Sequence, residues 1–397
     1  MQSEDAVPPS RLLPLDLARL CAIILMVQGH TIDALLSVNY RQGAFFNTWL
    51  FVRGLTAPTF LLLSGLSFGI ATTRRWQAFL YFSKPVIRRL RRFLGLVISG
   101  YAMHLPARSI SGFRELDALV SQTWLRVDVL QCIGVSLATL QLLVVIIRRQ
   151  SHFSRLVLTL AFVVILSTPL LWNVTEASHL PTCFTDYLTS KNGSLFPLFP
   201  WAGYLFLGAG IGVLFVRHGF TVSRLLVSWA GFVGLFLILL GLVLDKLPIS
   251  LYPKTDFWRT SPDLFLIRTG CVFLLLTIAA LMSRLVPSRS DWIHTIARQS
   301  LMIYFVHVCV VYSSVWNPGL RDWVGASLGP LASATCASFL VIFMVFLALI
   351  WFRAKQRIEA SGRLRRYSRA MLATCWSPIA QAKLLLSITR PDVAPEN

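Results

Sequence analysis

The stretch of sequence that decides the fold class covers residues 16–37 and reads DLARLCAIILMVQGHTIDALLS. Apolar side chains dominate it over a length that matches one membrane-spanning helix, which needs about 20 mostly apolar residues. Arg19 and His30 interrupt the apolar run, and the acidic residues Glu4 and Asp5 precede it. Because a cleaved signal peptide combines a basic start with an uninterrupted apolar core, the sequence predicts a first helix that is retained in the membrane.

Similar apolar stretches recur along the whole chain. The sequence is 55% hydrophobic and 14% charged, whereas soluble domains carry about 25% charged residues. We therefore predict an all-α polytopic membrane protein with about ten transmembrane helices. The predicted spans are 16–37, 50–71, 90–106, 127–147, 155–172, 198–216, 223–244, 263–283, 297–316 and 332–352.

A predicted transmembrane domain, residues 16–352, is flanked by a short N-terminal segment (1–15) and a basic tail (353–397). The formal net charge is +20. With the N-terminus in the cytoplasm, nearly every pair of loops places more Lys and Arg on the cytoplasmic side, as the positive-inside rule requires. Both termini are therefore expected in the cytoplasm. The sequence contains no soluble basic region that would bind a nucleic acid, so no nucleic-acid partner is expected.

The predicted cytoplasmic loop at 72–92 interleaves basic with aromatic residues. Its second half carries Arg88, Arg89, Arg91 and Arg92. Such a segment typically lies along the headgroups and is attracted by anionic lipid, so membrane lipid is an expected partner. The same four cations could instead bind an anionic ligand in the cytoplasm.

Several chemical motifs are missing from the sequence. The seven cysteines are far apart, and because no metal-ligand spacing is present, no metal is expected. A phosphate-binding glycine-rich loop, a serine nucleophile elbow and a paired His-Glu zinc motif are also missing. The candidates for function are therefore the ionisable side chains within the spans, which are rare because they are costly to place there.

Arg19 and His30 are the first such candidates. They are eleven positions apart, which places them about 20° apart around the helix axis and about 16 Å apart along it. A long anionic ligand that enters from the cytoplasm would meet Arg19 first and bring its reactive end to His30. The alternatives are a snorkelling cation at Arg19 and a buried structural histidine at His30. Asp33, on the next turn, is a candidate substrate contact.

Arg53, Asp128 and Gln131 form the next group of candidates. Arg53 could hold a carboxylate or stabilise an oxyanion, or it could form an ion pair with Asp33 or Asp128. Asp128 and Gln131 share one helix face because they are three positions apart, and Gln131 is a candidate substrate contact. Asp128 could orient His30 and raise its basicity, or it could only cap the helix that follows.

Four further candidates lie in the later spans. Trp201 could stack on a sugar ring, although an interfacial tryptophan is the commoner use of this residue. Arg268 opens the predicted eighth span and, like Trp201, is a candidate substrate contact. Tyr304 and His307 lie one turn apart and are polar enough to face a cavity, so Tyr304 is a candidate substrate contact and His307 a second catalytic candidate.

These motifs together resemble a known family. Residues 15–19 (LDLAR) and 26–30 (MVQGH) are similar to the start of the heparan-alpha-glucosaminide N-acetyltransferase catalytic domain family, within the acyltransferase-3-like superfamily. The spacing of Arg19 and His30 resembles the first-helix signature of that superfamily. The likeness covers residues 11–312 and includes RGLTAP (53–58), DVLQCIG (128–134), FPLFPW (196–201), SPDLFLIR (261–268) and SLMIYFVH (300–307).

The resemblance implies an enzyme that takes an acyl group, commonly acetyl, from cytoplasmic acyl-CoA. The acceptor would be a hydroxyl or amine of a glycan or lipid-linked saccharide on the far side of the membrane. His30 would be the base that activates the acceptor, or a transient acyl carrier, and Arg19 with the arginines of the 72–92 loop would meet the CoA phosphates. The lysosomal enzyme of the family has a key histidine in its first luminal loop, whereas residues 31–49 contain none here. His30 instead occupies the place of the superfamily's first-helix histidine.

A bacterial inner membrane is expected, because no lysosomal targeting region or glycosylated luminal domain is evident, and a homodimer remains open. Two other functions also remain open. A secondary transporter or lipid flippase would use the intramembrane Asp, Arg and His residues as a substrate or proton path, and a non-catalytic scaffold would use them to pair helices.

Overall fold

The computed structural model describes residues 12–106, 124–176, 180–219, 229–247, 252, 255–286 and 291–360. Throughout these residues the regular structure is helical, apart from two isolated β-bridges. A helix satisfies its backbone amides and carbonyls within its own segment, as the interior of a membrane requires. The prediction of an all-α protein is therefore confirmed for the described residues.

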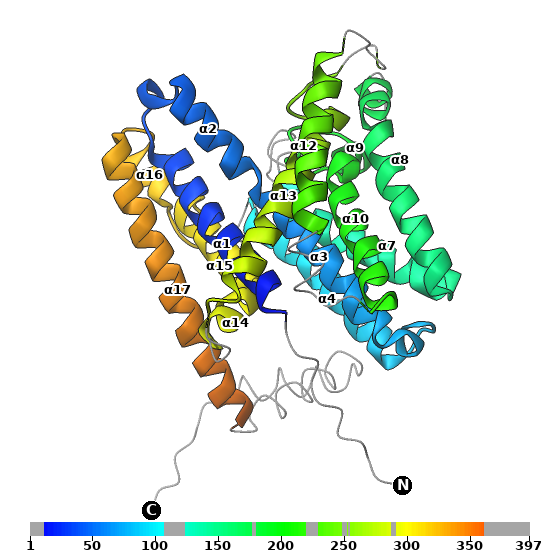
Figure 1. Ribbon diagram of the computed structural model, residues 1–397. Coiled ribbons are helices and arrows are strands. Elements are labelled where there is room, and N and C mark those ends of the chain that lie inside the picture. The colour runs from blue at the N-terminus through cyan, green and yellow to red at the C-terminus, as the bar shows by residue number, and fades with distance from the viewer. Residues whose placement is uncertain are drawn as a thin grey trace, which may run out of the picture. The chain divides into compact units, whose positions relative to one another are not determined.

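The order of the helices along the chain can be followed in Figure 1. The first half contains α1 (Leu13–Leu35), α2 (Gly43–Gly54), α3 (Thr56–Thr73), α4 (Lys84–Met103), α7 (Val129–Ile147), α8 (Gln150–Glu176) and α9 (Thr182–Leu188). The second half contains α10 (Leu198–Arg217), α12 (Gly231–Lys246), α13 (Pro262–Met282), α14 (Asp291–Arg298), α15 (Ser300–Tyr312), α16 (Leu320–Val324) and α17 (Pro330–Ala360). Short 3-10 helices lie at Val38–Tyr40 and Trp76–Phe79.

Seven helical segments among the described residues are long and apolar enough to cross a membrane. They are α1, the α2–α3 pair, α7, α8, α10, α13 and α17, and the α14–α15 pair adds one more if it crosses as a broken span. The chain is therefore an integral membrane protein. Of the two other predicted spans, 90–106 falls on the arginine-rich α4, and 223–244 begins outside the described residues and continues on α12. The total of about ten spans stays a prediction.

The predicted span 297–316 is not one straight helix. It is divided at Gln299 into α14 and α15, which are bent by 60° relative to each other. α14 is amphipathic, because it buries Ile293 and Ile296 while Asp291 and Arg298 are exposed. These charged residues are costly to carry into an apolar environment, which explains why α14 does not simply extend the apolar α15.

Glycines bring two helices of the core into backbone contact. A Cβ atom at Gly65 of α3 would overlap the carbonyl oxygen of Leu205, and one at Gly208 of α10 would overlap that of Leu62. Small residues allow this close approach of helices within a membrane. The glycines of α3 and α10 therefore serve helix packing. The glycines in this seam are Gly65, Gly69, Gly208 and Gly212.

The chain divides into two compact units, residues 1–342 and 343–397. The hydrophobic core and all the candidate residues of the spans lie in the first unit. Of the second unit, the structure describes residues 343–360, which are the end of α17. Most of the predicted basic tail lies outside the described residues.

Candidate active site

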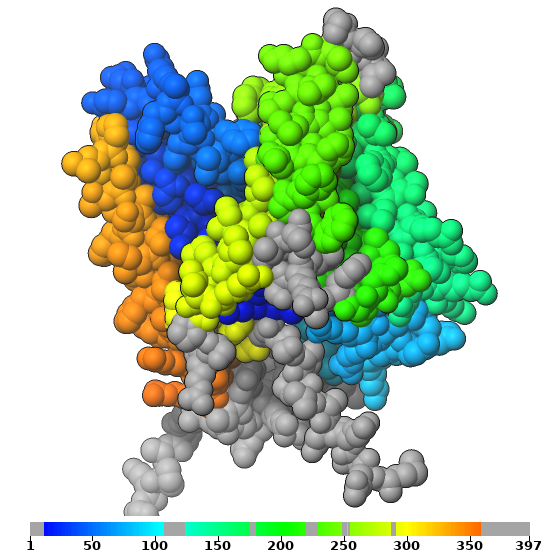
Figure 2. All heavy atoms as spheres, in the orientation of Figure 1, coloured from blue at the N-terminus to red at the C-terminus, as the bar shows by residue number. Residues whose placement is uncertain are grey.

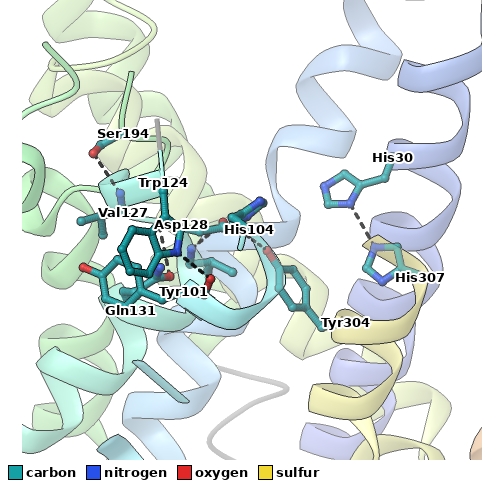
Figure 3. Close-up of polar contacts among 11 residues, drawn as sticks. His30, Tyr101, His104, Trp124, Val127, Asp128, Gln131, Ser194, Tyr304 and His307 are labelled. Carbon is teal, nitrogen blue, oxygen red and sulfur yellow. Dashed lines mark hydrogen bonds and ion pairs between the residues drawn. The ribbon is translucent and has the colours of Figure 1, made fainter. Parts of the chain in front are cut away.

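Two histidines that are far apart in the sequence meet within the helical bundle. His30 of α1 and His307 of α15 lie with Nδ1 of His30 at 3.0 Å from Nε2 of His307. Their rings are stacked, with centroids 5.1 Å apart and an angle of 17° between the planes (Figure 3). His307 is fully buried. The structure therefore brings together the first and second catalytic candidates of the sequence.

The hydrogen bonds of this pair fix which nitrogen carries each proton. Nδ1 of His307 lies 2.7 Å from the carbonyl oxygen of Ile303, which can only accept a hydrogen bond. Nδ1 of His307 therefore carries a proton, and in a neutral imidazole Nε2 is then an acceptor. His30 must donate to it through Nδ1–H. Among the described residues no hydrogen bond reaches Nε2 of His30, so its lone pair is free, which is what a proton acceptor needs.

An ion pair lies directly beside His30. Arg53 of α2 places Nη1 at 2.7 Å from Oδ1 of Asp33, and the hydroxyl of Tyr312 donates to Oδ2 at 3.2 Å. The Tyr312 ring is edge-on to His30 with centroids 5.6 Å apart. A Cβ atom at Gly29 would lie 2.7 Å from Cγ of Arg53, so the arginine stem packs on this glycine. Of the partners left open for Arg53, the structure selects Asp33.

Asp128 has a different partner from the one expected. Its Oδ1 accepts from the backbone N–H of Val129 at 2.6 Å, and Gln131 completes a capping box at the start of α7. Its Oδ2 accepts from the Tyr304 hydroxyl at 2.8 Å and lies 3.2 Å from Nε2 of His104. Of the two roles left open for Asp128, the structure shows the helix cap, and no hydrogen bond joins Asp128 to His30 among the described residues. The cap fixes Asp128 on α7, and the imidazole within its reach is that of His104.

Gln131 also differs from its expected role as a substrate contact. Its side chain is fully buried, and Oε1 accepts from the backbone N–H of Asp128 at 3.3 Å. A Cβ atom at Gly100 of α4 would overlap this side chain, so α4 packs closely over it. Gln131 therefore positions Asp128 and does not line an open site.

Tyr304 connects the two groups of polar residues. Its hydroxyl bonds to Asp128, while its ring lies 5.7 Å from the His307 ring at an angle of 73°. Figure 3 shows Tyr304 between the His104–Asp128 pair and the His30–His307 pair. Sequence reasoning missed His104, although the rule that singled out His30, an ionisable residue in a predicted span, applies to it equally.

Arg268 and Trp201 lie together at another part of the site. The Arg268 guanidinium is 5.9 Å from the centroid of the Trp201 ring, and its Nε is buried without a hydrogen-bond partner among the described residues. Nη2 of Arg268 would be 3.8 Å from a Cβ atom at Gly54, the residue after Arg53. Figure 2 shows the surface hollowed between α2, which carries Arg53, and α12, which packs on the Arg268 helix α13.

Arg19 is held at the opposite end of α1. Its Nη1 lies 3.0 Å from Oδ1 of Asp16, and Nη2 donates to the hydroxyl of Ser67 on α3. Oδ2 of Asp16 lies 2.7 Å from Nδ1 of His294 on α14. Arg19 and His30 therefore contact different neighbouring helices, although they share a face of α1.

The basic segment is also arranged differently from the expected loop. α4 begins at Lys84, so the four arginines lie on the first turns of a helix. Arg89 turns inward, where it donates to Thr72 Oγ1 at 2.9 Å and Gln141 Oε1 at 3.2 Å, with its guanidinium 3.4 Å from the Phe79 centroid. The side chains that remain exposed are Arg88, Arg91 and Arg92.

Apolar helices surround the paired imidazoles and the arginine–carboxylate pair, so the chain is an integral membrane protein with a polar site among its helices. The model of one protein family, described as heparan-alpha-glucosaminide N-acetyltransferase, catalytic, matches residues 11–252. The chain belongs to this family of membrane acetyltransferases, as the sequence motifs indicated. No individual curated protein matches the chain. Arg268, Tyr304 and His307 lie beyond the matched residues.

Proposed function

We propose that this protein transfers an acetyl group from cytoplasmic acetyl-CoA to an amine or hydroxyl of a glycan or lipid-linked saccharide on the far side of the membrane. The observation that carries the proposal is the free lone pair on Nε2 of His30, which the hydrogen bond to His307 leaves unoccupied. A neutral imidazole with one fixed N–H and one open nitrogen is suited to general-base catalysis.

The transfer itself needs one proton acceptor and one group for the developing oxyanion. His30 Nε2 takes a proton from the acceptor atom as that atom attacks the thioester carbonyl carbon. The bond from this carbon to the acceptor forms, the bond to sulfur breaks, and His30 passes the proton to the leaving thiolate. Arg53, anchored on Asp33 next to His30, would stabilise the oxyanion.

The two substrates would approach from opposite ends of α1. Exposed Arg88, Arg91 and Arg92 at the start of α4, together with Arg19, would bind the phosphates of CoA, because guanidinium groups suit phosphate oxygens. At the other end, Trp201 offers an aromatic face to a sugar ring, and Arg268 beside it would donate to sugar oxygens.

The test is transfer of a labelled acetyl group from acetyl-CoA to a saccharide that ends in glucosamine, with the purified protein in liposomes. His30→Ala is expected to lower the rate by about 10²- to 10⁴-fold, the usual contribution of a general base. The matched control is His152→Ala, which removes an exposed histidine of α8 and should keep the wild-type rate. Saccharide movement across the membrane without acetyl-CoA consumption would instead make the protein a transporter and overturn the proposal.

A further inference from the structure

A histidine–carboxylate pair, formed by His104 and Asp128, lies on the other side of Tyr304 from the His30–His307 pair. It has no part in the mechanism above. His104 directly follows α4 as its C-cap, and Asp128 is the N-cap of α7. Nε2 of His104 lies 3.2 Å from Oδ2 of Asp128. The His104 side chain is 42% exposed whereas that of Asp128 is 8% exposed, so the imidazole is the accessible member of the pair.

The proton positions of this pair follow from the same reasoning. A carboxylate oxygen can only accept, so Nε2 of His104 carries the proton and donates to Asp128. Nδ1 of His104 then holds the free lone pair, and among the described residues no hydrogen bond occupies it. The free nitrogen is Nε2 in His30 and Nδ1 in His104.

The two pairs differ in the charge that they can hold. His104 is backed by a carboxylate, which stabilises the imidazolium that forms when Nδ1 takes a proton. His30 is backed by His307, which is neutral and whose far nitrogen is tied to a backbone carbonyl. The His104–Asp128 pair therefore stabilises a full imidazolium charge better than the His30–His307 pair does. The His30–His307 pair suits a proton that is transferred onward during the reaction.

An amine acceptor needs both kinds of group. An aliphatic amine has a pKa of about 8 to 10 and is mostly ammonium at neutral pH, with no lone pair to attack a thioester. It must lose one proton before the attack and a second as the new bond forms. The balanced reaction is R–NH3⁺ + acyl–S–CoA → R–NH–acyl + CoA–SH + H⁺. His30 and the thiolate account for one of the two protons.

We propose that His104 is a further catalytic residue, which removes the first proton from the ammonium form of an amine acceptor while Asp128 stabilises the resulting imidazolium. The free amine then attacks the acetyl carbonyl carbon, His30 takes the second proton and gives it to sulfur, and His104 releases the first proton to water. This inference rests on the proposed acetyl transfer and adds the residue that prepares the acceptor.

Besides His104, the charge of Asp128 also acts on His30 and His307 among the described residues. From α7 His104 faces Asp128, and from α15 Tyr304 shares the same carboxylate oxygen. Tyr101 lies one turn earlier on α4, and its carbonyl accepts from the His104 backbone N–H at 3.2 Å. Because His104→Gln keeps Asp128 and its charge, a change in the pH profile of that variant is assigned to loss of the His104 imidazole.

The experiment measures acetyl transfer to a glucosamine-terminated saccharide by wild-type protein and His104→Gln across a pH series. Glutamine keeps an N–H for Asp128 but offers no base at the position of Nδ1. We expect the variant to lose about 10²-fold in rate at pH values below the pKa of the amine. The loss should shrink as the pH rises through that pKa, because water then supplies the free amine. His152→Gln is the matched control and should follow the wild type at every pH.

The possible outcomes separate the two proposals. A loss in His104→Gln that is the same at every pH would overturn the role of His104 and leave acetyl transfer intact. No transfer by the wild-type protein would overturn the proposed function as well.

Tyr304→Phe is a second variant that does not depend on the folding of the first. It removes one donor from Asp128, strengthens the carboxylate's hold on the imidazolium, and should move the acidic limb of the profile to higher pH. An unmoved limb would overturn the inference.

Discussion

Helix α1 meets the α14–α15 pair at two places, and the two contacts are built differently. At one end, Asp16 lies 2.7 Å from His294 and 3.0 Å from Arg19, so the carboxylate has a cation and an imidazole as partners. At the other end, His30 lies 3.0 Å from His307 and keeps one nitrogen free. A polar cluster whose members satisfy one another stabilises a helix contact, whereas one that leaves a lone pair open can react. We therefore expect a structural role for the contact of Asp16 with His294 and a chemical role for the contact of His30 with His307.

The largest effect after that of His30 itself is expected at His307. His307→Ala removes the acceptor that fixes the tautomer of His30, so kcat should fall by about 10- to 100-fold, as for other partners that orient a reactive imidazole. His307→Gln keeps an oxygen that can accept from His30 and should lose less. Acetyl transfer measured over a range of acetyl-CoA concentrations checks this. Equal losses in the two variants, or a loss confined to KM, would contradict it.

A smaller loss is expected from Gly29→Ala. The new Cβ would lie 2.7 Å from Cγ of Arg53, so the arginine stem must move and its position beside His30 changes. We expect a fall in kcat of about tenfold, since displacements well below 1 Å already slow positioned reactions. Gly95→Ala on α4 is the matched control, because nothing lies within 4 Å of a Cβ there. If both alanines behaved alike, Arg53 would have no part in the reaction.

The smallest effect on rate is expected at the other contact. His294→Ala removes the imidazole from Asp16 and leaves the Arg19 ion pair in place. The unfolding midpoint in detergent should fall by about 2–4 °C, the shift that loss of about 1 kcal/mol produces in a mid-sized protein, while kcat stays at the wild-type value. A fall in kcat as large as that of His307→Ala would remove the distinction between the two contacts.

The fold was accessible from sequence because its main signal is local. Runs of apolar residues predicted every helix that the structure finds capable of crossing a membrane, since burial in lipid depends mainly on composition over one span. The cap at Asp128 is local too, because Asp128 and Gln131 stand three positions apart at a helix start. The bend at Gln299 was missed, because an average over a window cannot separate the amphipathic α14 from the apolar α15.

The site was only partly accessible from sequence. His30 and His307 were each identified as costly residues within spans, but they are 277 positions apart, and no local pattern announces their contact. The sequence also does not show whether Asp128 lies near His30 or near His104. That depends on how α4, which precedes His104, and α15 pack against α7. The inward turn of Arg89 likewise depends on Phe79 and Gln141, which lie on other elements. Tertiary packing decides these pairings.

The glycine seam between α3 and α10 has a mechanical consequence. At these crossings backbone faces backbone, with carbonyl oxygens of Leu62 and Leu205 occupying the space where side chains would otherwise lie. If α3 slid along α10, these oxygens would clash with the Cβ atoms of neighbouring residues. The two helices therefore move as one rigid unit. We therefore expect any movement that opens the site to take place by tilting of other helices against α3 and α10. A tilt of α1, which carries His30, would change the distance between His30 and His307 of α15.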